Sequence, residues 1–280
     1  MTTNKRERAP KNEKHKIEAA PSIPFPKDDE DFMLSLARGL AVINSFSETR
    51  RSLTMAEVSQ HTKLSRAVVR RCLHTLSMLG YVSLYQRHYS LRPKILRLGH
   101  SYLASAPLAQ LAQPYLEKIT KAINESCSIA TRDGSHITYI ARSASSERIM
   151  SVDLRVGSEL PAYCTSMGRV LLANLPAAEL DQILRNTKLV SHTRFTITDP
   201  TMLRTLLTRT RTQGYCIVDQ ELEFGLRSIA VPVKDVNGKV VAALNVGVNA
   251  GRYSKVQLKE LALPVLKAIS HELGGLLLSS

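Results

Sequence analysis

The sequence has few cysteines, and their spacing is not that of a metal or disulfide framework. The four cysteines of the 280-residue chain lie more than thirty residues apart, with no CxxC pair and no Cys/His cluster at zinc spacing (Cys72, Cys127, Cys164 and Cys216). This argues against a zinc site and a secreted disulfide scaffold, and predicts reduced thiols in a cytoplasmic protein. We expect neither a metal nor a cofactor.

Long apolar runs are also missing. No uninterrupted apolar stretch approaches the roughly 18–20 residues that cross a bilayer, and the charged first residues are followed by no apolar segment of the kind found in secretion signals. The hydrophobic residues, 44% of the chain, are still enough for packed cores, which excludes a mainly disordered protein. The chain length predicts about two domains and no association with a membrane.

Common catalytic motifs are absent as well. The sequence contains no GxxxxGK[ST] loop, no GxGxxG after a strand and no HExxH. An enzyme could use Cys164 as nucleophile, with His136 or His192 as base and Asp219 to orient it, but a buried, inert cysteine is the commoner outcome. We therefore expect a protein that is not an enzyme.

Positive charge is abundant and unevenly distributed. The chain has 38 Lys and Arg against 24 Asp and Glu, a net charge of +14. Residues 1–31 have a net charge of 0, residues 32–106 of +9 and residues 107–280 of +5. Because nine of the charges fall in 75 residues, the central segment is expected to bind a polyanion.

The same central segment has the pattern of a winged helix-turn-helix domain, expected over residues 31–92 after a flexible tail at 1–30. A first helix is expected over Asp31–Phe46, capped by Asp31, with an apolar face made by Phe32, Leu36, Leu40, Ile43 and Phe46. The capping box at Thr54 begins a second helix, and Ser65 caps a third that ends near Leu79. A hairpin follows, with two short strands on either side of Gln86-Arg87-His88.

The third helix separates into two faces at about 100° per residue. Val69, Cys72, Leu73, Leu76 and Leu79 cluster on one side, which predicts a buried face. The predicted DNA-binding residues lie on the other side, at the start of the helix and in the wing: Ser65, Arg66, Ala67, Arg70, Arg71, His74 and Arg87. Arginine can bind guanine edges or phosphates, and a small alanine lets the helix approach the groove.

Residues 93–106 are expected to form a linker helix, and residues 107–280 a second domain of mixed type. Strands are predicted at Ser128–Arg132, Ile137–Arg142, Ile149–Leu154, Tyr215–Asp219, Ser228–Val233 and Val240–Val248, the last two joined by an Asn237-Gly238 turn. Helices are predicted at Ser166–Asn174, Ala178–Arg185, Pro200–Thr212 and Ser254–Leu276. Strands joined by hairpins favour an α+β domain with an antiparallel sheet.

Several ordered motifs resemble one family. The segment Leu53–Leu91 resembles the DNA-binding domain of the IclR family of bacterial transcriptional regulators, and the runs Leu160–Ala173, Gly214–Glu221 and Gly225–Val233 resemble its effector-domain signatures. The run Asp153–Arg169 is similar in particular to the PcaR/PobR branch, whose members respond to protocatechuate, 4-hydroxybenzoate or β-ketoadipate. The resemblance covers roughly residues 30–278.

This resemblance implies an effector pocket between a curved sheet and the helix that begins at Ser166. The implied lining residues are Ile149, Val152, Ser166, Met167, Val218, Asp219, Glu221 and Ser228. The helix N-terminus suits a carboxylate, and Arg155 or Arg169 could add a charged partner.

The expected function is regulation of aromatic-acid catabolic genes by a homodimer, or a dimer of dimers, that binds near-palindromic double-stranded operator DNA. The effector is expected to be an aromatic acid or β-ketoadipate. Two alternatives stay open: a non-specific or architectural DNA-binding protein, and an IclR-type regulator of another carbon-source pathway.

Overall fold

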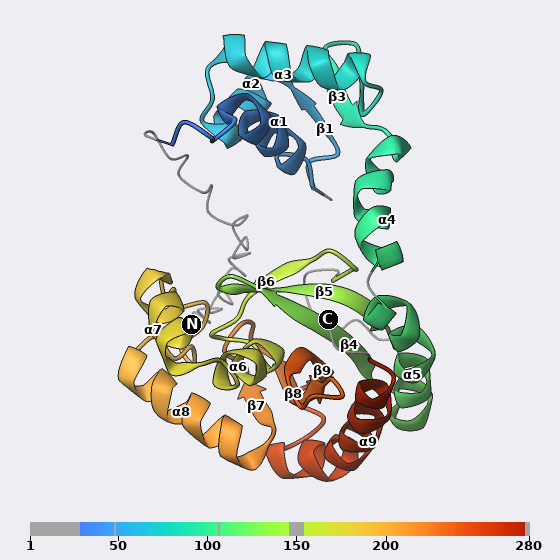
Figure 1. Cartoon of the computed structure of the whole chain (residues 1–280), viewed down its shortest axis with the longest axis vertical. Coiled ribbons are helices and arrows are strands. Elements are labelled where there is room, and N and C mark those ends of the chain that lie inside the picture. The colour runs from blue at the N-terminus through green and yellow to red at the C-terminus, as the bar shows by residue number, and fades with distance from the viewer. Residues whose placement is uncertain (1–28, 48, 106, 146–153, 278–280) are drawn as a thin grey trace, which may run out of the picture. The chain divides into compact units, whose positions relative to one another are not determined.

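The computed structural model describes residues 29–47, 49–105, 107–145 and 154–277 (Figure 1). The chain forms two compact units, Met1–Leu98 and Gly99–Ser280. Their boundary lies inside helix α4 (Leu96–Ser105), within the segment for which we expected a linker. Nearly all of the predicted tail at 1–30 falls outside the described residues.

The N-terminal unit is a winged helix-turn-helix. Its elements are α1 (Leu34–Asn44), β1 (Ser52–Thr54), α2 (Met55–Thr62), α3 (Arg66–Met78), β2 (Val82–Tyr85) and β3 (His88–Leu91). The three strands form an antiparallel sheet in the order β1-β3-β2. Its core is a single cluster of buried apolar side chains from all three helices and the sheet, including Val42, Leu53, Val58, Val69, Leu73 and Val82.

The helix starts that depend on capping are confirmed. The Thr54 hydroxyl accepts from the Glu57 amide, while a Glu57 carboxylate oxygen accepts from the Thr54 amide at 2.7 Å, which completes a capping box on α2. Ser65 caps α3 by accepting from the Val68 amide. These signals act within four residues, so they could be predicted without tertiary structure.

The prediction for α1 was wrong in two respects. The helix begins at Leu34, and its N-cap, Met33, has no side-chain hydrogen bond. Asp31 does not cap it, because it lies two residues before the N-cap; its own amide donates to an Asp29 carboxylate oxygen in the preceding turn. The predicted apolar face is only partly used: Leu36 is 58% exposed and Leu40 48% exposed, while Val42 on another side is fully buried.

In α3 the predicted buried face is confirmed for Val69, Leu73 and Leu76. The prediction failed at Leu79, which is 53% exposed. This residue lies just past the end of the helix, where the chain turns at Gly80 with φ of 77°. The helical angle that placed Leu79 over the core therefore no longer applies.

The C-terminal unit is built on a six-stranded antiparallel sheet in the order β6-β5-β4-β9-β8-β7. The strands are β4 (Ser126–Asp133), β5 (His136–Ser143), β6 (Glu159–Pro161), β7 (Cys216–Asp219), β8 (Leu226–Lys234) and β9 (Val240–Asn249). The short strand β6 was not predicted. The strand predicted at Ile149–Leu154 lies outside the described residues except for Leu154, which is not in a strand.

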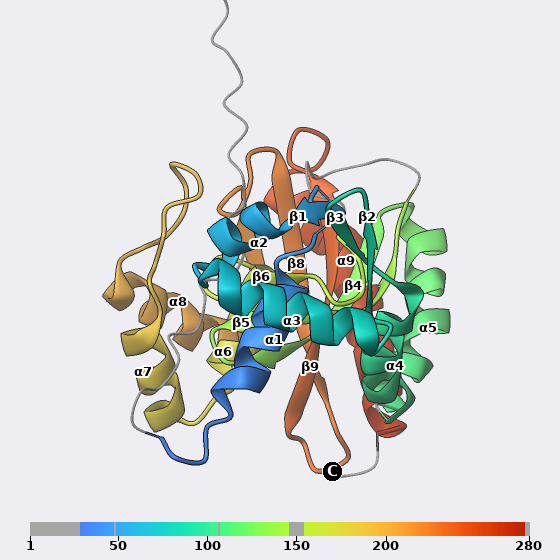
Figure 2. The ribbon, with the colours of Figure 1, turned by 90° about the horizontal axis from the view of Figure 1, so that it is seen from above.

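Helices cover both faces of this sheet. The helices that cover the sheet are α5 (Pro107–Ile123), α6 (Ser166–Ala173), α7 (Ala177–Asn186), α8 (Pro200–Gln213) and α9 (Lys255–Gly275). The short 3-10 helix η1 (Pro93–Ile95) and α4 precede them in the chain. Figures 1 and 2 show α5 and α9 on one side of the sheet and α6, α7 and α8 on the other. Alternate strand residues serve the two cores: Ile129 and Leu244 face α5 and α9, while Ala130 and Ala243 face α6. No helix in the described part of the chain is long and apolar enough to span a membrane.

Strand β5 contains one residue more than its partner. Ile129 pairs with Ala141 and Ala130 pairs with Tyr139, so Ile140 is an extra residue in β5. Ile140 and Ala141 both pack in the core under α5 and α9, although they are adjacent in sequence. This β-bulge reverses the inward and outward alternation for the residues that follow it.

Helix α9 crosses the sheet at a point where only glycine fits. A Cβ atom on Gly274 would lie 2.1 Å from the carbonyl oxygen of Lys234 in β8. The neighbouring Gly275 has nothing within 4 Å of the same position. The close packing of α9 on β8 therefore depends on Gly274.

We expect Gly274→Ala to lower the free energy of unfolding by about 1–3 kcal/mol, because the new methyl group forces the helix away from the strand. Gly275→Ala is the matched control and should be neutral or slightly stabilising. Urea unfolding of both variants measures this. Equal midpoints for the two variants would contradict the prediction.

Candidate functional site

The exposed face of α3 carries basic side chains that have no ion pair within the described residues. Arg66, Arg70, Arg71 and His74 are exposed, and so is the small Ala67 between them. The hydroxyl of Ser65 lies at the same end and caps the helix. The predicted DNA-binding residues of α3 thus lie together on one side, opposite the core face of Val69, Leu73 and Leu76.

The wing ends in a two-residue turn with an uncommon backbone. Gln86 and Arg87 have φ values of 45° and 69°, the left-handed pair of a type I′ turn, which usually contains Asn-Gly. The His88 ring nitrogen Nδ1 lies 3.1 Å from the Gln86 carbonyl oxygen. This turn places the exposed Arg87 at the tip of the β2–β3 hairpin.

In the C-terminal unit, α6 is buried along its whole length. Its N-cap, Thr165, accepts a hydrogen bond from the Gly168 amide at 3.2 Å. A Cβ atom on Gly168 would lie 2.2 Å from the Ala162 carbonyl oxygen, so a glycine is needed for the chain to approach its own helix. The N-terminus of α6 is thereby held against the sheet.

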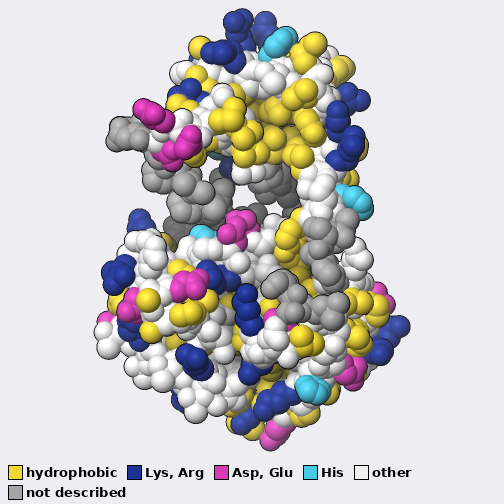
Figure 3. All heavy atoms as spheres, in the orientation of Figure 1, with side chains coloured by type: hydrophobic (Ala, Val, Ile, Leu, Met, Phe, Trp, Pro, Cys, Tyr) yellow, Lys and Arg dark blue, Asp and Glu magenta, His cyan; other side chains and the backbone are white. Residues whose placement is uncertain are grey.

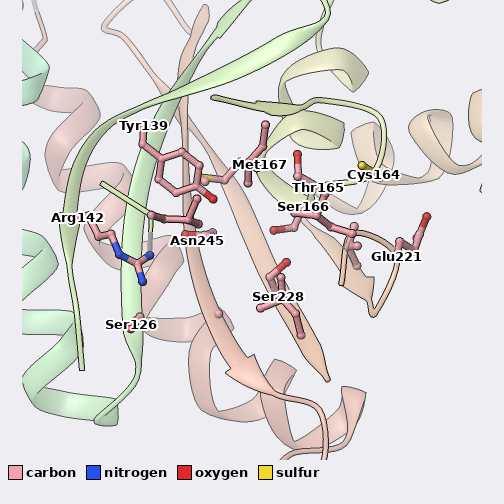
Figure 4. Close-up of a pocket in the computed structure, with 16 residues that line it drawn as sticks. Ser126, Tyr139, Arg142, Cys164, Thr165, Ser166, Met167, Glu221, Ser228 and Asn245 are labelled. Atoms are coloured by element: carbon pink, nitrogen blue, oxygen red, sulfur yellow. The ribbon is translucent and has the colours of Figure 1, made fainter. Parts of the chain in front are cut away.

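A cavity lies between the N-terminus of α6 and the inner face of the sheet (Figure 4). It contains about 570 Å³ of space not filled by atoms, part of it open to solvent. Its wall is mostly apolar with a few polar groups, as small-molecule sites are. The lining residues are Ser126, Tyr139, Arg142, Leu154, Leu160, Cys164, Thr165, Ser166, Met167, Val218, Glu221, Leu222, Leu226, Ser228, Asn245 and Gly247.

The cavity brings together Ser166, Met167, Val218, Glu221 and Ser228 from the predicted effector-binding set. Ile149 and Val152 lie outside the described residues.

Two further residues of that set lie elsewhere. Asp219 is not part of the lining; its carboxylate accepts from Arg227 at 2.8 Å and pairs with Lys255 at 3.2 Å, which ties the start of α9 to β7. Arg155 is exposed in the loop before β6 and is also not part of the lining.

Arg169 and Glu221 form a buried, bidentate ion pair. The Arg169 Nη1 and Nη2 atoms donate to the two Glu221 carboxylate oxygens at 2.7 and 2.6 Å, and Nε donates to the Tyr163 carbonyl at 2.7 Å. The Glu221 carboxylate also accepts from the Ile197 amide at 3.1 Å. Both side chains are at least 93% buried. The guanidinium that we considered for an effector is therefore already neutralised by protein.

The opposite side of the cavity carries a different cation. Arg142, on β5, donates from Nη1 to the Ser128 hydroxyl at 3.0 Å, and no carboxylate among the described residues forms an ion pair with it. Figure 4 shows Arg142 across the cavity from Ser166. The buried Ser166 Oγ and Asn245 Oδ1 have no hydrogen-bond partner among the described residues. Buried polar atoms usually have partners, so these two suit a polar ligand.

Sequence reasoning missed Arg142, Tyr139 and Asn245. A regular β5 would direct Arg142 away from Tyr139, to the opposite face of the sheet; the bulge at Ile140 brings both to the cavity. The available signal was a charged residue inside an apolar strand pattern, but its direction depended on pairing with β4. Asn245 was equally visible as a polar residue inside the apolar run of β9.

The catalytic alternative finds no support in the geometry of Cys164. Burial raises the pKa of its thiol to about 12, so the reactive thiolate is scarce at neutral pH. His192 stacks on Tyr163, and burial lowers its pKa. In the described part of the chain no hydrogen bond joins Cys164 to a histidine, and its thiol faces the Pro161 carbonyl.

We expect Arg169→Met to lower the free energy of unfolding by about 3–5 kcal/mol, because it leaves the Glu221 charge buried without its partner. Arg204→Met is the control: Arg204 pairs with Asp181 at the surface, where both are more than a third exposed, and its loss should cost under about 1 kcal/mol. Adding Glu221→Gln to Arg169→Met should restore part of the loss, since no buried charge is then left. Chemical unfolding of the three variants decides this; no recovery in the double variant would contradict the explanation.

Comparison with known proteins agrees with both units. The IclR helix-turn-helix domain matches residues 35–84, and the bacterial transcriptional regulator IclR C-terminal domain matches residues 100–272. The Pca regulon regulatory protein of Pseudomonas putida is 54% identical over 245 residues, which cover 88% of this chain and 84% of that protein.

Two solved structures are similar in both sequence and fold. A transcriptional regulator from Rhodococcus sp. RHA1 is 43% identical with a TM-score of 0.75, covering 87% of this chain and 97% of that one. A double mutant of the PobR inducer-binding domain from Acinetobacter, in complex with 3-hydroxybenzoic acid, is 31% identical with a TM-score of 0.58, covering 61% of this chain and all of that one. The two domain matches and the 54% identical relative show that the chain belongs to the IclR family of bacterial transcriptional regulators.

Proposed function

We propose that this regulator controls genes of aromatic-acid catabolism, binding a small carboxylate in the cavity of its C-terminal unit and operator DNA through α3 and the wing. The observation that supports it best is the cavity itself, with Arg142 on one wall and the open N-terminus of α6 on the other. The relatives support the gene class: one regulates the Pca regulon, and a PobR domain holds 3-hydroxybenzoic acid. Such a regulator acts in the cytoplasm, where bacterial DNA lies.

The effector is held at two ends in this proposal. A carboxylate binds Arg142, because a guanidinium without a carboxylate partner is the strongest anion-binding group on the wall. The other end of the effector reaches Ser166, whose hydroxyl has no partner and whose helix presents free backbone amides. A hydroxyl or a second carboxylate fits there, so hydroxybenzoates, protocatechuate and β-ketoadipate are all candidates.

The apolar walls suit the body of such an effector. Tyr139, Leu160, Met167 and Leu222 line the space between the two polar ends. Met167 is flexible enough to adapt to either a ring or an aliphatic chain. Arg169 and Glu221 hold the α6 end in place and add no net charge to it.

The DNA-binding unit is proposed to act as a homodimer, or within a dimer of dimers. An apolar stripe is exposed along α1: the N-cap Met33 is 67% exposed, Leu36 58% and Leu40 48%, and hydrophobic side chains gather over this helix in Figure 3. A second copy covering this stripe would place two α3 helices in successive major grooves of a near-palindromic operator, about 10 base pairs apart or a multiple of it.

The effector changes DNA binding only if it prefers one of two arrangements of the dimer. Helix α4 contains the boundary between the two units and joins them covalently. In this proposal α4 transmits the change caused by the effector from the C-terminal unit to the DNA-binding unit. Two other readings predict different results. A non-specific DNA-binding protein would bind scrambled DNA as well as operator at two salt concentrations, and a regulator of another pathway would ignore aromatic acids and β-ketoadipate.

Arg70→Ala and Arg71→Ala should each weaken operator binding by about 1–3 kcal/mol if the guanidinium group contacts a base. Effector affinity should be unchanged, because both residues belong to the other unit. Arg97→Ala, an exposed arginine of α4, is the charge-matched control and should bind operator like the parent chain. Fluorescence anisotropy measures the operator affinity, and calorimetry the effector affinity. Loss of both activities together would indicate misfolding, and full operator affinity would contradict the assignment.

Arg142→Met should weaken effector binding about 10- to 150-fold, the loss of a charge-assisted hydrogen bond worth about 1.5–3 kcal/mol. Arg132→Met is the control, because Arg132 pairs with Glu179 and is not part of the cavity lining. Calorimetry with 4-hydroxybenzoate, protocatechuate and β-ketoadipate identifies the effector. The methyl ester of a bound acid should bind both forms equally weakly. Unchanged affinity in Arg142→Met would place the carboxylate elsewhere.

A further inference from the structure

The helical layer formed by α7, α8 and the loop between them has more cations than it can neutralise. Residues 175–215 contain six Lys or Arg and three Asp or Glu, a net charge of +3 out of the +5 of residues 107–280. The cations are Arg185, Lys188, Arg194, Arg204, Arg209 and Arg211, and the acids are Glu179, Asp181 and Asp199. Charge in the C-terminal half is therefore concentrated, as it is in the DNA-binding unit.

All three acids already have partners. Glu179 pairs with Arg132 from the sheet, and Asp181 of α7 pairs with Arg204 of α8. Asp199 caps α8 by accepting from the Met202 amide at 2.7 Å. Arg185, Lys188, Arg209 and Arg211 are exposed, and none has an ion pair within the described residues. Their charges are left for a partner outside the chain.

The exposed side of α8 has short polar side chains with arginines along both edges. Thr201, Thr205, Thr208 and Thr212 recur at three- and four-residue spacing and form an exposed stripe, while Leu203, Leu207 and Thr210 on the other side are buried. By helical position, Arg204 and Arg211 lie along one edge of this stripe and Arg209 along the other.

The threonine hydroxyls are occupied within the helix. Those of Thr205, Thr208 and Thr212 each donate to the carbonyl four residues earlier, at 3.1 Å. Any attraction to an anion therefore comes from the arginines, while the short side chains let the anion approach. Lys and Arg side chains are visible over this helical layer in Figure 3.

We propose that the exposed cations of α7, α8 and the loop between them, Arg185, Lys188, Arg209 and Arg211, bind the sugar-phosphate backbone of DNA next to the operator; we call them the α7–α8 face. The inference rests on the proposed operator binding and adds a second contact, made by the effector-binding unit. Arginine is suited to phosphate, and backbone contacts carry no sequence information, so this binding is independent of the flanking sequence. DNA fits better than an acidic protein surface because the threonine stripe has only short side chains between its cations, and the exposed apolar residues of this layer, Val190, Phe195 and Met202, lie off the stripe.

The test compares two duplexes, the operator alone and the operator extended on each side by about 20 base pairs of random sequence, two helical turns. The full chain should bind the extended duplex more tightly and with a steeper dependence on salt. The triple variant Arg185→Ala/Arg209→Ala/Arg211→Ala should lose the gain. Because a dimer then loses six arginines, its salt slope on extended DNA should become shallower by about 5. On the operator alone it should bind like the parent chain.

A matched control removes the same charge elsewhere on this unit. Lys234→Ala/Lys239→Ala/Lys267→Ala replaces three exposed lysines of β8, the β8–β9 turn and α9, and should keep the full gain on extended DNA. Equal loss in both triple variants would mean that net charge alone matters, and the proposed face would be wrong. It would also be wrong if the parent chain bound both duplexes equally.

Two further results have separate meanings. If the parent chain bound operator no better than scrambled DNA, the proposed function would fail, and this inference with it. If the arginine variant changed the mass of the free protein in light scattering, the face would be an interface between copies and the inference would be overturned. Thermal unfolding of both triple variants, expected to match the parent chain, excludes a folding defect.

Discussion

The buried ion pair between Arg169 and Glu221 is the interaction on which the shape of the cavity depends. It joins α6, the only helix buried along its whole length among those described, to the segment after β7, and it recruits the Tyr163 carbonyl and the Ile197 amide to the same junction. Removing two charges from water is costly, and the bidentate geometry with further hydrogen bonds at both ends offsets that cost. As a result the α6 N-terminus stays fixed against the sheet with its first hydroxyl, Ser166, turned to the cavity.

The two units use positive charge in different ways. On α3, cations stay exposed and separate, which suits a partner whose charges repeat along a line. In the C-terminal unit, Arg169 is neutralised by Glu221 beside the cavity, while Arg142 is left facing the mostly apolar space. An ion in that space is screened less than at the surface, so a single guanidinium can select for an acid among apolar compounds of similar size. The same residue type thus serves affinity in one unit and selectivity in the other.

Most of the fold could be predicted because its signals are local. The capping box at Thr54 and the cap at Ser65 lie where they were expected, α9 begins at the predicted Ser254 with a second capping box, and the Asn237-Gly238 turn joins β8 to β9. The failures involve contacts distant in sequence. Strands β1 and β6 have three residues each and exist only because β3 and β5 pair with them. The exposed Leu36 and Leu40 fit the helical period of α1, but the period does not say which apolar side meets α3.

In the cavity, the motif residues Ser166 and Glu221 could be predicted, while Arg142 could not, since its direction is set by one extra residue in β5.

That extra residue has an evolutionary consequence. Ile140 is the only feature that separates the observed β5 from a regular strand, and the residues before and after it are paired normally with β4. Deleting the codon for Ile140 alone would leave Tyr139 and Arg142 two positions apart in a regular strand, so both side chains would still face the cavity. A related regulator with one residue fewer at this point therefore keeps the same side chains at its cavity, whereas an alignment that places the gap after Arg142 would compare side chains from opposite faces of the sheet.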